Sequence, residues 1–209
     1  MLAAPAAAGC VIFARPLEVP PNDQPTLLLV SGGLAAPMSE IARHPWFAGR
    51  EAGASSWQAW EVGGGGGLAG PFDNSPYVEP ILHMVWRGEE AQRGIECLRR
   101  EAPIWLAQLD YLVWPGPNSN TFGDAMLRAC DLHASLPATS VGRDFLGVVG
   151  VAWSTEGTGF QFETPLIGFR IGLREGIELH ILGLAIGIDL WPPAIIVPLG
   201  PGRIGFADR

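Results

Sequence analysis

The chain of 209 residues contains no lysine, so that all thirteen of its basic residues are arginine. The absence of lysine excludes any mechanism that forms a Schiff base on a lysine amine. Charged residues make up only 16% of the chain, and the net charge at pH 7 is −8. Because binding to a phosphate backbone needs clustered cations, this charge argues against a nucleic acid as partner.

Cysteine is also scarce, and its pattern indicates no special chemistry. The three cysteines are Cys10, Cys97 and Cys130, an odd number without any short spacing. Zinc sites and disulfide frameworks need closely spaced or paired cysteines, so the sequence predicts neither of them. No group of His, Cys and Asp residues has the spacing of metal ligands, and we expect no metal and no other cofactor.

Long hydrophobic runs are missing as well. No stretch reaches the roughly 18–20 uninterrupted apolar residues of a membrane-spanning helix. The nearest segment, residues 181–200, is broken by Asp189 and by two prolines, and we predict buried strands there. Its alternative use is as a contact surface for a protein partner or a membrane. The opening MLAAPAAAGC lacks a basic region and a proper apolar run, so it predicts no working secretion signal, and we expect a soluble chain.

Glycine and proline, in contrast, are abundant. The chain has 28 glycines and 19 prolines, a composition that favours turns and short strands. The run of glycines at 63–67 predicts a mobile loop. Residue patterns predict strands at 26–32, 42–49, 55–62, 82–88 and 109–114, and helices at 88–102 and 120–132.

Composition divides the chain into three parts. Residues 1–25 are proline-rich and predict an irregular segment. Residues 26–145 contain the predicted strands and helices of an α+β core. Residues 146–209 are rich in glycine and β-branched residues, and we expect a strand-rich extension packed on the core.

The segment WPGPNSNTF at residues 114–122 is the most distinctive motif of the chain. Its prolines and glycine predict a bend, and Asn118 or Ser119 is a good cap for the helix that follows. The same geometry suits a nucleophile, because a side chain at a helix N-terminus lies beside free backbone N–H groups. Ser119 would be that nucleophile, with the N–H groups of Ser119 and Asn120 near the oxyanion. A plain turn with a helix cap also explains the motif, and for an isolated match of this kind it is the favoured explanation.

A serine nucleophile needs a general base. The chain offers four histidines, which are His44, His83, His133 and His180. His44 lies beside Trp46 in a predicted strand, where an aromatic wall would exclude water. Glu61, at the end of the next strand, would orient the imidazole as the third member of a triad. Asn74 follows the glycine run and either reaches the same cleft or forms an ordinary Asx turn.

Longer strings of the sequence resemble a bacterial family named only as the domain of unknown function 3750. The strings are VWPGPNSNTF (113–122), LPATSVGRDF (136–145), LREGIELHILGLAIGIDLWPPA (173–194), WRGEEA (86–91) and GPGRIG (200–205). The resemblance covers residues 26–206. Members of this family often carry an N-terminal membrane anchor, so the resemblance implies a location in the bacterial cell envelope.

A more distant resemblance is to circularly permuted papain-like hydrolases of the NlpC and lecithin:retinol acyltransferase type. Their histidine begins a strand, a polar residue follows on the next strand, and an Asn-Cys-x-x-Phe motif opens a helix. Residues His44, Glu61 and Asn118–Phe122 occur in that order, with Ser119 in place of the cysteine. Pro45, inside the first of these strands, departs from the pattern because proline cannot donate to a sheet ladder.

This second resemblance implies both a fold and a set of roles. The fold is an antiparallel sheet with two main helices, to which the strand-rich extension is added. The catalytic residues would be Ser119, His44 and Glu61. The binding residues would be Asn118, Asn120, Asn74 and Trp46.

Three functions remain open on the sequence alone. The first is a hydrolase or acyltransferase that acts on an amide or an ester. The second is a non-catalytic module that keeps the cleft and binds a small molecule, a peptide or a lipid, because a hydroxyl is far less ionised than a thiol. The third is a structural or assembly subunit of a larger, membrane-associated complex.

Overall fold

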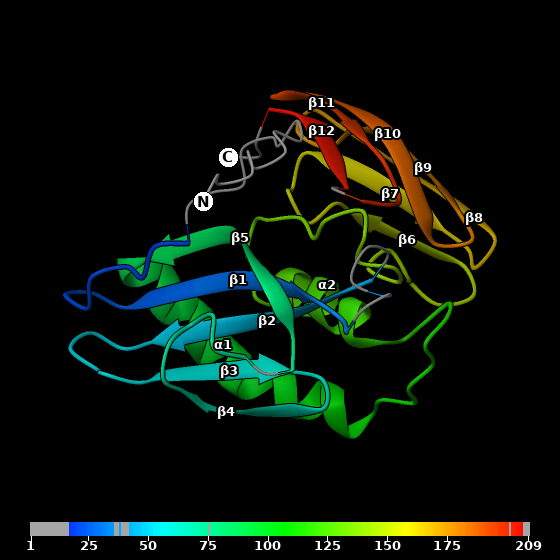
Figure 1. Ribbon diagram of the computed structural model, residues 1–209. Helices are drawn as coiled ribbons and strands as arrows, with labels where there is room; N and C mark the ends of the chain where they lie inside the picture. Colours follow the sequence, from blue (N-terminus) through cyan, green and yellow to red (C-terminus); the bar gives the residue numbers. More distant parts are fainter. Residues whose placement is uncertain (1–16, 36–37, 39–41, 75, 201, 207–209) are drawn as a thin grey trace, which may run out of the picture.

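A computed structural model describes residues 17–35, 38, 42–74, 76–200 and 202–206 of the chain. Two antiparallel sheets and two helices form the described part (Figure 1). The structure is therefore of the α+β type that the sequence predicts. The predicted irregular N-terminal segment lies largely outside the described residues.

Sheet A forms the first half of the chain. Its strands are β1 (Thr26–Gly33), β2 (Arg43–Arg50), β3 (Trp57–Glu61), β4 (Gly64–Leu68) and β5 (Val78–Arg87), in the spatial order β4-β3-β2-β1-β5. Strand β1, which lies between β2 and β5, is buried along its whole length. Because alternate side chains point to opposite faces of a sheet, its continuous apolar run TLLLV supplies two separate cores.

Helices α1 (Gly88–Ala107) and α2 (Ser119–Ala129) cover one face of sheet A. Leu27 and Leu29 of β1 pack with Phe122 and Met126 of α2 in the core on this face. On the opposite face, a second apolar cluster includes Trp46 and is covered by the segment that contains Phe72 and Tyr77.

Sheet B forms the second half of the chain. Its strands are β6 (Gly150–Trp153), β7 (Gly159–Glu163), β8 (Ile167–Gly172), β9 (Gly176–Ile181), β10 (Leu184–Leu190), β11 (Pro193–Ile196) and β12 (Arg203–Gly205). They pair in sequence order as an antiparallel meander. Helix α2 lies between the two sheets, with Arg128 bonded to Gln161 of β7 (Figure 1). The strand-rich extension that the sequence predicts is thus present.

Two local predictions are wrong. The glycines at 63–67 belong in part to a strand, because β4 pairs along its length with β3, and backbone pairing needs no side chain. Residues 109–114 form no strand; the N–H of Leu112 instead donates to the carbonyl of Pro117 at 2.9 Å. The apolar pattern of this segment misled the prediction because its side chains from Tyr111 to Trp114 are exposed rather than packed in a sheet.

The expectation of no disulfide is also wrong. Cys97 of α1 and Cys130, which follows the last turn of α2, are joined by a disulfide with their Cα atoms 5.6 Å apart. A separation of 33 residues hides this pair in the sequence, whereas the antiparallel docking of two helices brings the two cysteines together. Cys10 lies outside the described residues.

The prediction of buried strands at 181–200 is correct in part. Strands β10 and β11 form there, but only alternate residues are buried, and Ile186, Ile188 and Ile195 are exposed. Among the described residues, no helix has the length and the apolar character needed to cross a membrane.

Candidate functional site

Asn118, and not Ser119, caps helix α2. Its side-chain oxygen accepts hydrogen bonds from the backbone N–H groups of Asn120 and Thr121 at 2.9 and 3.1 Å. The Thr121 hydroxyl in turn accepts a bond from the N–H of Asn118 at 3.1 Å, which completes a capping box. This network explains why several capping residues follow one another in the motif.

The amide groups of Asn118 and Asn120 also hold a neighbouring loop. Asn118 Nδ2 donates to the carbonyls of Val113 and Val141, and Asn120 Nδ2 donates to the same Val141 carbonyl at 2.9 Å. Thr121 donates to the carbonyl of Gly142 at 2.8 Å. Asn118 and Asn120, predicted to bind a ligand, therefore use their amide N–H groups to fix the loop to the start of α2.

Ser119 occupies the first helical position, on the side of α2 that faces sheet A. Gly123 lies one turn further on the same side, and a Cβ built there would be only 3.1 Å from Cγ of Pro45 in β2. The close approach of Gly123 to Pro45 places the first turn of α2 beside the start of β2. Ser119 is nearly buried, with 9% of its surface exposed.

His44 and Glu61 form a buried pair at this same end of sheet A. Nε2 of His44 lies 2.8 Å from Oε2 of Glu61, although the two residues are 17 positions apart in the sequence. The antiparallel pairing of β2 and β3 explains the contact, because β2 starts where β3 ends. The contact between Glu61 and His44 is thus present, and the orienting role of Glu61 stays a prediction.

Tyr77 completes this arrangement. Its ring stacks on His44 with the centroids 4.1 Å apart and the planes at 8°. Burial, together with the nearby Glu61 carboxylate, raises the pKa of the Tyr77 hydroxyl to about 12. The hydroxyl therefore stays protonated at neutral pH. Tyr77 was not predicted as a site residue, because an isolated tyrosine in a loop belongs to no recognisable sequence motif.

Ser119 approaches the His44–Glu61 pair without joining it. Within the part of the chain that the structure describes, no hydrogen bond connects the Ser119 hydroxyl to His44. Pro45 faces α2, so the alternation along β2 turns His44 and Trp46 toward the face that carries Tyr77. The catalytic assignment of Ser119, His44 and Glu61 stays a prediction.

The other predicted residues have structural partners or lie elsewhere. Trp46 is buried and donates its indole N–H to the carbonyl of Pro71 at 3.0 Å. Asn74 accepts a backbone bond from Tyr77, and its buried Nδ2 has no hydrogen-bond partner. His83 contacts the Ser31 hydroxyl at 2.7 Å, and His133 lies near the Thr155 carbonyl.

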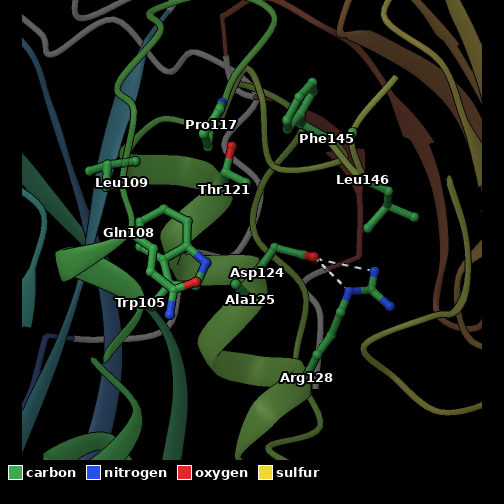
Figure 2. A pocket seen from close by; sticks show the side chains of 11 residues that line it. Trp105, Gln108, Leu109, Pro117, Thr121, Asp124, Ala125, Arg128, Phe145 and Leu146 are labelled. Carbon is green, nitrogen blue, oxygen red and sulfur yellow. Dashed lines mark hydrogen bonds and ion pairs between the residues drawn. The ribbon is translucent and has the colours of Figure 1, made fainter. Parts of the chain in front are cut away.

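A cavity of about 330 Å³ lies against α2, between the end of α1 and the loop around Phe145 (Figure 2). Thr121, Asp124 and Arg128 line it from α2, and the Asp124 carboxylate points to the Arg128 guanidinium, with Oδ2 and Nε 2.6 Å apart. These residues lie about half a turn around the helix from Ser119. The cavity is therefore on the opposite side of α2 from the His44–Glu61 pair.

A cluster of charged side chains lies between the inner face of sheet B and α2, and all of them are buried except Arg128, whose side chain is 21% exposed. We call the following residues the buried charge cluster: Asp124, Arg128, Arg143, Asp144, Glu163, Arg170, Glu178 and His180. Alternation along β7, β8 and β9 turns one member or two from each strand toward α2. The charged residues lie far apart in the sequence, so no local motif predicts the cluster.

Electrostatics within the buried charge cluster favour the charged forms of His180 and Glu178, whereas burial raises the pKa of the Asp124 and Glu163 carboxyl groups. Burial opposes protonation of His180, but the carboxylate of Asp144 and hydrogen bonds to Glu163 and Glu178 raise its pKa to about 9. Burial also opposes ionisation of Glu178, yet Arg143 and Arg170 hold its pKa well below the usual range. With His180 protonated, the four carboxylates of the cluster face four cations.

Asp144, Glu163 and His180 have their ligand atoms within 4.8 Å of one another, as a metal site requires. However, the His180 ring nitrogens already contact Glu163 and Glu178. The guanidinium of Arg143 lies 3.0 Å from Asp144. A divalent cation there would have to displace a proton and lie beside a fixed positive charge, so these residues fit an internal ion network better than a metal.

Comparison with known families identifies the region that holds the WPGPNSNTF motif. Residues 33–145 match the model of a family described as protein of unknown function (DUF3750). The chain belongs to this family. The matched region contains His44, Glu61 and Ser119 and ends where sheet B begins. No curated protein matches the chain, and no solved structure does so either.

Proposed function

We propose that the protein is a serine-type hydrolase or acyltransferase that acts on an amide or an ester. Ser119 is the nucleophile, His44 the general base and Glu61 the residue that orients the imidazole. The observation that carries this proposal is the buried 2.8 Å contact between His44 and Glu61 at the end of sheet A where α2 begins. The core would then be of the circularly permuted papain-like type.

The proposed chemistry gives each of the three residues one role and requires the Ser119 hydroxyl to reach Nδ1 of His44. The Ser119 oxygen attacks the carbonyl carbon of the substrate while Nδ1 of His44 accepts the hydroxyl proton. The tetrahedral intermediate then collapses, and the leaving amine or alcohol takes that proton from His44. Water or another acyl acceptor then attacks the acyl group on Ser119 and gives its proton to His44. When this second tetrahedral intermediate collapses, the proton passes to the Ser119 oxygen and the acyl product leaves.

The start of α2 offers few backbone N–H donors to the oxyanion of the tetrahedral intermediate. The N–H of Ser119 is one of the donors that helix geometry leaves without an acceptor inside the helix. The N–H of Asn120 donates to Asn118, which removes the second donor predicted from the sequence. Since each oxyanion donor contributes about 10²–10³ in rate, we expect slow turnover unless the substrate brings a further donor close.

The disulfide of the chain supports a setting in the cell envelope, and its charge bears on the substrate. The Cys97–Cys130 disulfide is of a kind that persists in oxidising compartments such as the periplasm. The absence of lysine and the acidic net charge fit a substrate that is not a nucleic acid. We propose a peptide, a lipid ester or a small amide as the substrate class.

A fluorophosphonate probe, which modifies only activated serines, tests the proposal. We expect labelling of the unmodified chain and its loss in Ser119→Ala and in His44→Ala. Glu61→Gln should label more slowly, because the amide still orients the ring but no longer stabilises its cation. Ser56→Ala removes an exposed serine just before β3 and is the matched control, which should label normally.

The absence of labelling in a chain with an intact circular-dichroism spectrum would overturn the hydrolase proposal. The non-catalytic binding module would then be the better function, because it needs the same His44–Glu61–Tyr77 arrangement without an activated serine. Labelling that persists in Ser119→Ala would place the reactive serine elsewhere and would equally refute the assignment.

A further inference from the structure

The outer face of sheet B points away from α2 (Figure 1). Large apolar side chains are exposed on it. It extends over all strands from β6 to β12. Its exposed apolar residues are Val151, Trp153, Phe160, Ile167, Phe169, Ile171, Ile177, Leu179, Ile181, Leu184, Ile186, Ile188, Leu190, Ile195 and Ile204. We call this set the outer apolar face.

Sheet B is polar inside and apolar outside, the reverse of the usual pattern. In β8 and β9, the side chains of Arg170, Glu178 and His180 point inward and are buried, while Phe169 and Leu179 point outward. Soluble antiparallel sheets normally bury the apolar face and expose the polar one. The inward charges are paired with one another and with the loop that follows α2, so the apolar face has no covering element among the described residues.

The extent of the outer apolar face exceeds what isolated proteins leave exposed. Its side chains are between 36% and 74% exposed, and together they present on the order of 1,000 Å² of apolar surface. The largest apolar patch on a typical monomer is about 300–600 Å². A stable interface needs about 800 Å² from each partner, and the outer apolar face reaches that size.

We propose that the outer apolar face binds the same face of a second copy of this chain. Two such sheets would pack face to face as a β-sandwich, about 10 Å apart. A two-fold axis between the two sheets and near β9, the middle strand of sheet B, places the outer apolar face of each copy against that of the other. The face is self-complementary because it presents no charge that would meet a like charge across the axis.

The chemistry favours a second copy over a lipid surface. The chain has a net charge of −8 and no lysine, so it lacks the cationic rim that attracts anionic headgroups. The open edges at β6 and β12 would leave unpaired backbone groups in a hydrocarbon phase, where each is costly. In a sandwich of two copies, these edges stay at the rim in contact with water.

The test is the mass of the purified chain in solution, measured by multi-angle light scattering and by sedimentation velocity at several concentrations. We expect a particle of two chains, each of 22.3 kDa. A single-chain mass over the whole concentration range would overturn the proposal. A single-chain mass combined with co-flotation on neutral phosphatidylcholine vesicles would overturn it in favour of a lipid surface.

Two matched variants locate the interface. Ile186→Glu places a charge near the middle of the outer apolar face, where it would be buried against the apolar face of the other copy. The variant should therefore consist of single chains. Ile104→Glu changes a similarly exposed apolar residue on α1 and should leave the two-chain mass unchanged. Dissociation by Ile104→Glu, or a two-chain mass that survives Ile186→Glu in the folded protein, would show that the copies meet elsewhere.

This inference does not depend on the proposed hydrolase activity. The interface lies on sheet B, whereas the labelling experiment reports on Ser119 and His44 at the end of sheet A. If Ile186→Glu is isolated as single chains that still react with the probe, the two proposals are separated directly. If Ile186→Glu does not fold, the mass of the unmodified chain still decides the outcome.

Discussion

Nη2 of Arg170 lies 2.9 Å from Oε2 of Glu178 in the interior between sheet B and α2, where both side chains are almost completely buried. The same carboxylate oxygen also accepts from Arg143 and lies 3.2 Å from Nε2 of His180. One glutamate of β9 thus ties a neighbouring strand to the loop that follows α2. The stability of this interior depends on keeping every charge paired, because an uncompensated buried charge is costly.

Replacement of Arg170 by methionine should destabilise the protein strongly. The variant leaves Glu178 with one guanidinium partner fewer in a buried site, and we expect a loss of about 3–5 kcal/mol in the free energy of unfolding. Arg174→Met is the control, because that side chain is 62% exposed and lies 3.9 Å from its partner Glu156. It should cost less than about 1 kcal/mol. Equal losses in urea unfolding would contradict the assigned role of the cluster.

Stability should fall as the pH rises above neutrality. The pKa of His180 is raised to about 9 in the folded chain, compared with about 6.5 in an unfolded chain. A raised pKa means that the contribution is complete below pH ~6.5 and disappears between that value and pH ~9. We expect the difference in unfolding free energy between the unmodified chain and His180→Gln to shrink by about 3 kcal/mol over this range. A difference independent of pH would show that His180 is not protonated in the fold.

Reduction of the Cys97–Cys130 disulfide should destabilise the packing of α1 on α2. Opening a loop of 33 residues increases the entropy of the unfolded chain, which corresponds to about 3–4 kcal/mol. Thermal unfolding with and without a reducing agent measures the effect, and Cys97→Ala/Cys130→Ala should match the reduced protein. That double variant should show no response to the reducing agent. A response would implicate another thiol.

Asn118 can be tested by separating its two roles. Asn118→Ala loses the cap of α2, which costs about 1–2 kcal/mol, and also leaves the carbonyls of Val113 and Val141 with fewer donors. Asn118→Ser keeps an oxygen for the cap but loses the amide donors, and should therefore show an intermediate loss. If the serine variant is as stable as the unmodified chain, the loop contacts contribute nothing and only the cap matters.

The sequence predicted the candidate site unevenly. The order of His44, Glu61 and Ser119 predicted a triad, and the structure brings His44 and Glu61 into contact but makes no hydrogen bond between His44 and Ser119 among the described residues. The helix cap was expected at Asn118 or Ser119, and capping preference is a local property that sequence reveals. The stacking of Tyr77 on His44 and the unpaired Nδ2 of Asn74 could not be predicted from the sequence, because the position of a loop side chain depends on which strand it packs against.

What the sequence determined by itself is the local structure. The apolar run of β1, the amphipathic pattern of α1 and the alternation in β9 each require one element type, whatever the rest of the chain does. Only the tertiary structure decided which face of an alternating strand is inside. An alternating pattern normally predicts the apolar face as the buried one, but His180 and Arg170 find partners on other strands of sheet B and, in Asp144, on the loop that follows α2. Because those partners come from distant parts of the chain, the pairing of charges, the disulfide and the outer apolar face all follow from the way the two sheets enclose α2.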